Sequence, residues 1–286
     1  MRELTEEWLR NVNEELRKND IPPRQRPWAA WSEWAKHAGV PIASDDEATK
    51  TIFAWFEKNT KAGSQHMGSL YAGTYYYDSC FWPVIIEICY GTVKLDAREA
   101  LKSMPESIAA GLFANQTKAL DYVSVWADCV DYAFGLDDLK KTGGFGRFTQ
   151  ELLNGGDQEM RATVALLLQN KPSPKAPESA RMCTEMFLKA FLAAKAGLTE
   201  DEAKYKIGHD LEKGLNRCLA FDAESELRDI RPHLNAFPDI GDRYKGSDKS
   251  PKELWRAYAI AQCVGSTVAR TLSGRDIRKT INVNNF

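Results

Sequence analysis

The sequence of 286 residues has no surplus of charge of either sign, because 38 lysines and arginines are set against 40 aspartates and glutamates. Without a basic surplus there is no general field that holds nucleic acid, so any contact with RNA must be local. Long apolar runs are also missing. The longest mainly apolar stretch, residues 80–90, contains Glu87 and is about half as long as the roughly 20 residues of a transmembrane helix. We therefore expect no membrane span and no membrane partner.

Targeting and metal-binding signals are absent as well. Residues 1–7 are acidic and polar, whereas a secretory signal begins with basic and then apolar residues, so we expect a cytoplasmic protein. The cysteines lack the Cys-x-x-Cys spacing and have no histidine at ligand distance in the sequence, so we expect reduced, buried thiols, no metal and no cofactor. These cysteines are Cys80, Cys89, Cys129, Cys183, Cys218 and Cys263. Neither a Gly-x-Ser-x-Gly elbow nor a phosphate-binding loop motif occurs.

The spacing of apolar residues is helical along almost the whole chain and predicts an all-α, multi-helix protein. Residues 65–90 are aromatic-rich and apolar on nearly every side, which predicts a long central helix that Pro83 kinks or divides. The glycine-rich stretches 142–146 and 154–157 predict turns. Three prolines within residues 172–177 predict a linker, so we expect an aromatic-rich helical region in residues 1–165 and a separate helical domain in residues 166–286.

The C-terminal half carries a recognisable order of elements. An amphipathic helix reads ESARMCTEMFLKAFLAAKAG (178–197), a helical hairpin contains GHDLEKGL (208–215), a polar loop contains DRY (242–244), and a last helix reads SPKELWRAYAIAQCVGSTVARTL (250–272). Over residues 176–273 this order resembles the HEPN superfamily of small antiparallel helical bundles. Residues 1–165 resemble no family in this way.

The resemblance implies two kinds of function. Some HEPN proteins are metal-independent ribonucleases that use an arginine, then four to six intervening residues, then a histidine, usually across a dimer interface. Others lack this motif and bind nucleotides or partner proteins, in several cases in bacterial toxin, immunity or defence systems. A homodimer is therefore one expected state of this chain.

Arg228, Arg231 and His233 are the candidate catalytic residues, because Arg228 and His233 have the spacing of the ribonuclease motif. A histidine can move the proton of a ribose 2′-hydroxyl while an arginine holds the phosphate, without a metal. However, this segment precedes the last helix, whereas the motif usually begins that helix, and Pro232 disturbs helical geometry. We therefore favour a structural or partner-binding role for these residues over catalysis.

Tyr75, Asp78, Arg243 and Tyr244 are the candidate binding residues. An ionised Asp78 among tyrosines and tryptophan is costly unless tyrosine hydroxyls bond to it, and a small-molecule pocket around Tyr75 and Asp78 is a further alternative. A separate set of aspartates, Asp121, Asp128 and Asp131, is spaced along one helical face. We expect this face to be solvated, with a hard-cation site as the alternative.

Together these features favour a non-catalytic cytoplasmic binding or regulatory module that engages a protein partner or a nucleotide. The alternative is a metal-independent ribonuclease in which His233 is the general acid–base and Arg228 holds the scissile phosphate of RNA.

Overall fold

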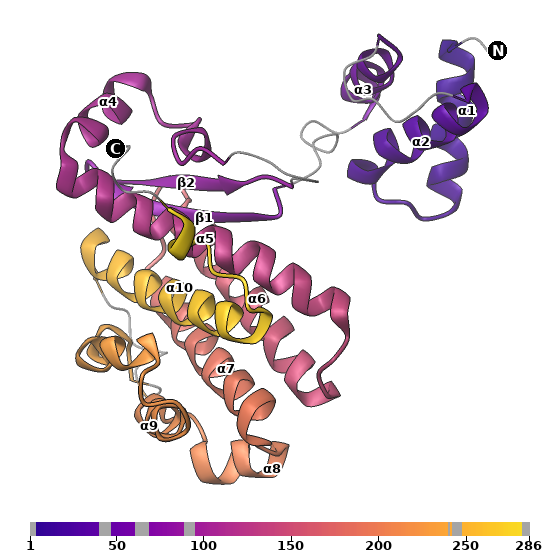
Figure 1. The fold of residues 1–286 in the computed structure, drawn as a ribbon. Helices are drawn as coiled ribbons and strands as arrows, with labels where there is room; N and C mark the ends of the chain where they lie inside the picture. The colour runs from indigo at the N-terminus through magenta and orange to yellow at the C-terminus, as the bar shows by residue number, and fades with distance from the viewer. Residues whose placement is uncertain are drawn as a thin grey trace. The chain divides into compact units, whose positions relative to one another are not determined.

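The computed structural model describes residues 4–39, 47–60, 69–88, 95–239, 241 and 248–281. The chain divides into two compact units, residues 1–69 and residues 70–286. The all-α class is confirmed, because helices dominate both units and the described residues form only one small two-stranded sheet (Figure 1). No helix of the described part is long and apolar enough to cross a membrane.

The first unit contains the helices α1 (Glu6–Lys18), α2 (Arg26–Ala38) and α3 (Glu47–Asn59). Thr5 caps α1 by accepting a hydrogen bond from the backbone of Trp8, and Gly39 ends α2 in the left-handed conformation. The core lies around Trp31, whose indole N–H donates to Thr49 Oγ1 over 2.6 Å. The tryptophan-rich pattern in this region thus builds a small core of its own.

The second unit begins with strands β1 (Tyr71–Tyr77) and β2 (Cys80–Ile86), and the rest is helical. Its longer helices are α4 (Glu106–Ala114), α5 (Gln116–Thr142), α6 (Arg147–Leu167), α7 (Ala176–Ala196), α9 (Leu211–Phe221) and α10 (Pro251–Ser273). Its remaining helices are η2 (Glu99–Leu101), α8 (Glu200–Glu202), η3 (Ala203–Ile207), η4 (Glu226–Ala236) and η6 (Arg278–Thr280). The expected start of the last helix is correct, since Ser250 and Glu253 form a capping box.

The expected domain boundary near residue 165 lies inside the second unit, which begins at residue 70. The proline-rich stretch only turns the chain from α6 into α7, and the two helices pack on each other.

Gly155 and Gly156, predicted to form a turn, lie inside α6. A Cβ at Gly156 would be 2.9 Å from a ring carbon of Phe187, so this glycine allows close helix packing rather than a change of direction. The turn predicted for residues 142–146 is present after α5, where Gly143 is left-handed.

The predicted central helix over residues 65–90 is wrong, because residues 71–86 form an antiparallel hairpin. Tyrosine, threonine, valine and isoleucine favour strands, and in a two-stranded sheet Pro83 removes only one ladder donor, opposite Thr74. Asp78 and Ser79 form the two-residue turn, with φ of 51° and 62°. Both values are those of a type I′ turn, whose backbone matches the twist of the strands.

The hairpin lies against the helices of the second unit (Figure 1): β1 contacts α5, α6 and α10, and β2 contacts α5 and η2. The Tyr258 hydroxyl of α10 accepts a hydrogen bond from the Thr74 backbone N–H over 3.1 Å and donates one to Gln262 Oε1 over 3.0 Å. Tyr71 also donates to Gln262, over 2.6 Å. A Cβ at Gly73 would be 2.6 Å from Cys129 Sγ, so the absence of a side chain there lets the strand approach α5.

Helices α5 and α10 run in the same direction. Gln262 of α10 donates to the Asp128 carbonyl of α5 over 3.4 Å, and further along both helices Gly135 faces Ala269. The N-terminal ends of the two helices therefore lie at the same end of the pair.

Candidate functional site

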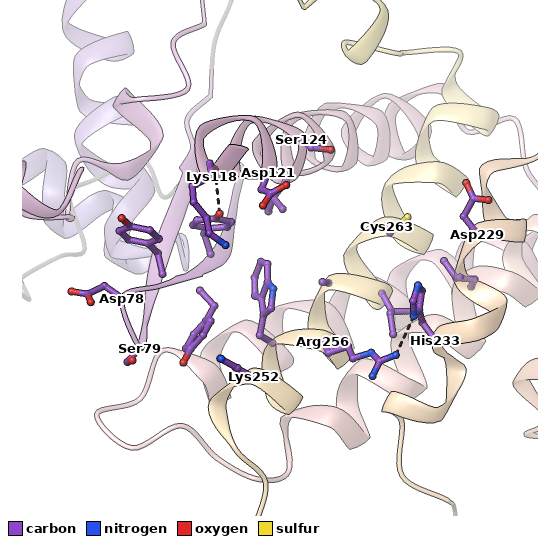
Figure 2. Close-up of a pocket in the computed structure, with 18 residues that line it drawn as sticks. Asp78, Ser79, Lys118, Asp121, Ser124, Asp229, His233, Lys252, Arg256 and Cys263 are labelled. Atoms are coloured by element: carbon purple, nitrogen blue, oxygen red, sulfur yellow. Dashed lines mark hydrogen bonds between the residues drawn. The ribbon is translucent and has the colours of Figure 1, made fainter. Parts of the chain in front are cut away.

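A groove of about 900 Å³ lies between the N-terminal halves of α5 and α10. The tip of the hairpin closes one end and η4 closes the other. Figure 2 shows Asp78, Ser79, Lys118 and Lys252 toward the hairpin end, and Asp229, His233, Arg256 and Cys263 toward the η4 end. The volume is within the range of about 300–1,000 Å³ that is usual for small-molecule sites.

The two helical walls present side chains at helical spacing. On α5 the lining positions include Lys118, Asp121 and Val125, and on α10 they include Lys252 and Arg256. Residues three and four apart share a helix face, so each wall alternates apolar surface with single charged groups. Trp255, on the same face of α10, packs edge-to-face on Tyr75 with ring centroids 5.5 Å apart.

His233 is exposed and bonded to Arg256, whose Nη2 lies 3.1 Å from His233 Nδ1 (Figure 2). An arginine can only donate, so Nδ1 is the acceptor and the ring proton is on Nε2. In this tautomer the second ring nitrogen, Nε2, is a donor beside the Arg256 guanidinium. The pair can hold an oxygen-rich group or take part in proton transfer.

The predicted catalytic trio is not brought together. Arg228 forms ion pairs with Glu224 over 3.4 Å and with Asp229 over 3.6 Å, and Arg231 donates to Asn216 over 2.6 Å. Neither arginine lines the groove, while His233 does.

The physical reason is the conformation of η4, which is a 3₁₀-helix. With three residues per turn, His233 shares a face with Leu227 and Ile230, both buried. Arg228 and Arg231 share the next face, about 120° away. The arginine that meets His233 comes from α10, and no spacing rule within one segment could have identified it.

The candidate binding residues Tyr75 and Asp78 both line the groove. Tyr75 is buried, its hydroxyl lies 3.5 Å from the Lys118 carbonyl, and burial raises its pKa to about 12. Asp78 is exposed at the hairpin tip, so the expectation of a carboxylate held by tyrosine hydroxyls is wrong. The other two candidates, Arg243 and Tyr244, lie outside the described residues.

Thiols in the second unit are free where the structure describes them, and Cys89 lies outside that part of the chain. Cys129, Cys183 and Cys218 are buried as expected, whereas Cys80 is exposed at the start of β2. Cys263 lines the groove, and burial raises its pKa to about 11. It therefore presents a neutral thiol to the groove and not a thiolate nucleophile.

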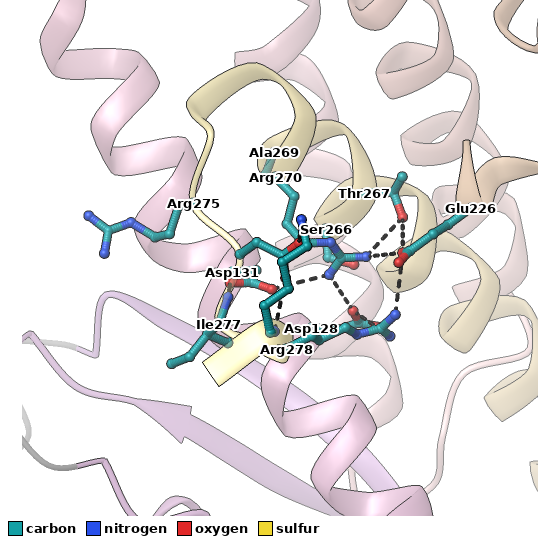
Figure 3. A network of polar contacts seen from close by, with 12 residues as sticks. Asp128, Asp131, Glu226, Ser266, Thr267, Ala269, Arg270, Arg275, Ile277 and Arg278 are labelled. Carbon is teal, nitrogen blue, oxygen red and sulfur yellow. Dashed lines mark hydrogen bonds and ion pairs between the residues drawn. The ribbon is translucent and has the colours of Figure 1, made fainter. Parts of the chain in front are cut away.

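A buried ionic cluster lies farther along the same two helices (Figure 3). Arg270 of α10 contacts Asp128 over 2.7 Å, Asp131 over 3.3 Å and Glu226, the first residue of η4, over 2.6 Å. Arg278 binds Asp128 over 2.8 Å, which fastens the segment after α10 to α5. The cluster thus joins α5, α10, η4 and η6.

The predicted solvated face of α5 is correspondingly wrong for two of its three aspartates. Asp121 is exposed, but Asp128 and Asp131 are buried. Burial raises the pKa of both carboxyls, and the nearby arginines act in the opposite sense. In the described part of the chain, no group of three or more metal-ligating side chains is placed to hold a metal ion.

The groove residues that the sequence did not single out are Lys118, Trp255, Arg256 and Lys252. Their only sequence signal is helical spacing, which the surface of any amphipathic helix shows. Comparisons with protein-family models, curated proteins and solved structures gave no match to this chain. The HEPN resemblance therefore remains a prediction.

Proposed function

We propose that this chain is a non-catalytic binding module of HEPN type, whose ligand is a nucleotide and whose ligand site is the groove between α5 and α10. The composition of the groove carries the proposal. Apolar and aromatic walls from Val125, Trp255 and Ile260 suit a base, with the Arg256 guanidinium as a donor to its edge, while Lys118 and Lys252 supply positive charge for phosphate. The bacterial toxin, immunity or defence setting and the homodimer rest on the resemblance alone.

The charge balance supports an anionic ligand. Of the three aspartates that line the groove, Asp229 lies beside Arg228, which offsets its charge from outside the groove. Asp78 and Asp121 are then outnumbered by the three cationic side chains of Lys118, Lys252 and Arg256, beside the positive ends of two helix dipoles.

Isothermal titration calorimetry with adenosine and guanosine nucleotides tests this function. We expect binding by the wild-type chain, weakened in Arg256→Ala and in Trp255→Ala. Arg147→Ala is the matched control, because Arg147 lies on α6 with its side chain 92% exposed, and binding should be unchanged. No binding of any nucleotide by the folded protein, or equal binding by all variants, would reject the proposal.

Ribonuclease activity is the second candidate, and one observation favours it: His233 is exposed in the groove and bonded to an arginine. In this alternative Arg256, in place of the predicted Arg228, holds the phosphate while His233 moves the proton. Incubation with labelled RNA separates the two arginines. Cleavage that is lost in His233→Ala and Arg256→Ala but kept in Arg228→Ala would establish this candidate against the non-catalytic function.

A further inference from the structure

The hairpin end of the groove carries two lysines in an unusual position. Lys118 is in the first turn of α5 and Lys252 in the first turn of α10, and both side chains line the groove. Cations destabilise helix N-termini because they face the positive end of the dipole. Neither ammonium group forms an ion pair with a carboxylate in the part of the chain that the structure describes. Together with the parallel course of α5 and α10, this places four positive features at one end.

An anion bound there would contact both walls of the groove at once. Backbone N–H groups at helix N-termini and lysine side chains are common phosphate ligands. The placement of the two lysines, unfavourable in the free protein, becomes favourable when a polyanion lies between them.

Two carboxylates, Asp121 and Asp78, also line the groove, and Figure 2 shows Asp121 beside Lys118 on the α5 wall and Asp78 projecting from the hairpin tip away from it. Alone they are too few to hold a metal ion and would repel phosphate. Mg²⁺, however, is usually held by one or two carboxylates together with the phosphates of a ligand. A nucleoside polyphosphate that arrives as its Mg²⁺ complex turns Asp121, which lies beside Lys118, from a repulsive into a binding group.

The η4 end of the groove is more apolar than the hairpin end. Ile230, Ala259, Ile260 and the neutral thiol of Cys263 form an apolar surface there, with the His233–Arg256 pair beside it. Such a surface suits a base, whose edge can accept hydrogen bonds from the guanidinium and from Nε2 of the imidazole. Cys263 is eleven positions beyond Lys252, which is about 16 Å along α10, whereas Arg256 is one helical turn, about 6 Å, beyond Lys252, so the apolar surface extends from Arg256 away from the lysines.

We infer that the groove binds the Mg²⁺ complex of a nucleoside di- or triphosphate, with the phosphates at the Lys118–Lys252 end and the base at the His233–Arg256 end. The inference rests on the proposed nucleotide-binding function and adds the number of phosphates and the direction of the ligand.

Calorimetric titration with adenosine, AMP, ADP and ATP, and with the guanosine series, tests it in the presence of Mg²⁺. We expect the diphosphate to bind at least about tenfold more tightly than the monophosphate, the usual effect of one further charge-assisted contact. This difference in affinity between diphosphate and monophosphate should be lost in the double variant Lys118→Ala/Lys252→Ala. It should be kept in Arg256→Ala, which should weaken the binding of all nucleotides of a series by the same factor. EDTA, or Asp121→Asn, should weaken diphosphate binding more than monophosphate binding.

Three results would overturn the inference while leaving nucleotide binding intact. The first is equal affinity for the nucleoside and its phosphates. The second is an increase in affinity from monophosphate to diphosphate that is lost in Arg256→Ala but not in the double lysine variant. The third is an increase of the same kind that does not depend on Mg²⁺. Absence of any nucleotide binding would instead reject the proposed function. Because both lysines are exposed at helix ends, far-ultraviolet circular dichroism should show the same helix content in the double variant as in the wild type.

Discussion

Replacement of Arg270 by methionine removes the centre of the buried ionic cluster. The Arg270 side chain is 6% exposed and bonds to Asp128, Asp131 and Glu226. Methionine keeps much of the volume but leaves Asp131, which is 0% exposed, without its arginine, while Asp128 keeps its ion pair with Arg278. Breaking a buried ion pair by removing one partner costs about 3–5 kcal/mol, because the remaining charge is no longer compensated. We expect a loss of this size in the free energy of unfolding.

Equilibrium unfolding in guanidinium chloride, followed by circular dichroism at 222 nm, measures the loss. Arg147→Met is the control, because Arg147 is 92% exposed and its pair with Glu151 lies in solvent. The control should change the free energy of unfolding by less than about 0.5 kcal/mol. Adding Asp131→Asn to Arg270→Met should restore part of the stability, since the uncompensated charge is then removed as well.

The pH dependence gives an independent check. Burial raises the folded-state pKa of Asp128 and Asp131, so the folded protein binds these protons more tightly than the unfolded chain. Their contribution to stability is therefore present at low pH and is lost as the pH rises through the folded pKa. Without Arg270 both folded pKa values rise further, so the destabilisation should be largest at a pH above the folded pKa values and shrink as the pH falls through them. A loss no larger than that of Arg147→Met, or one that does not vary with pH, would refute this account of the cluster.

The same unfolding assay checks three further substitutions. Ser79→Gly should stabilise the second unit by about 1 kcal/mol, because Ser79 has a φ of 62° that glycine adopts without strain, and a neutral or negative effect would contradict the turn assignment. Gly156→Ala should destabilise it by about 1–3 kcal/mol, because the new Cβ would lie 2.9 Å from the ring of Phe187, whereas a stabilising effect would show that α6 and α7 are not so close. Tyr258→Phe should cost about 1–3 kcal/mol, because the buried N–H of Thr74 loses its acceptor, and an unchanged midpoint would argue against that bond.

Helix periodicity predicted the fold class and most helices correctly because it depends on local spacing. The capping box at Ser250 and Glu253 and the left-handed Gly143 are local signals of the same kind, and both are present. The hairpin was missed because its apolar residues occur without strict alternation. Tyr71 and Tyr75 face helices, while several neighbours also pack against the core, so the pattern resembles that of a buried helix.

The candidate site was predicted in part. Tyr75, Asp78 and His233 meet in one groove although they are far apart in the sequence, whereas Arg228 and Arg231 point elsewhere. Spacing in the sequence could place Arg228 five residues before His233, but only the 3₁₀ conformation of η4 decides which face each side chain takes.

Local chemistry along the chain thus determined the helices, their caps and the cationic or aromatic character of each segment, because these depend on residues within a few positions of one another. The packing of α5 against α10 decided which of these side chains meet in the groove and in the buried ionic cluster. It placed two lysines from opposite walls at one end of a groove, set Arg256 rather than Arg228 beside His233, and buried Asp128 and Asp131 against Arg270. Such juxtapositions depend on how distant surfaces pack, and no pattern of neighbouring residues records them.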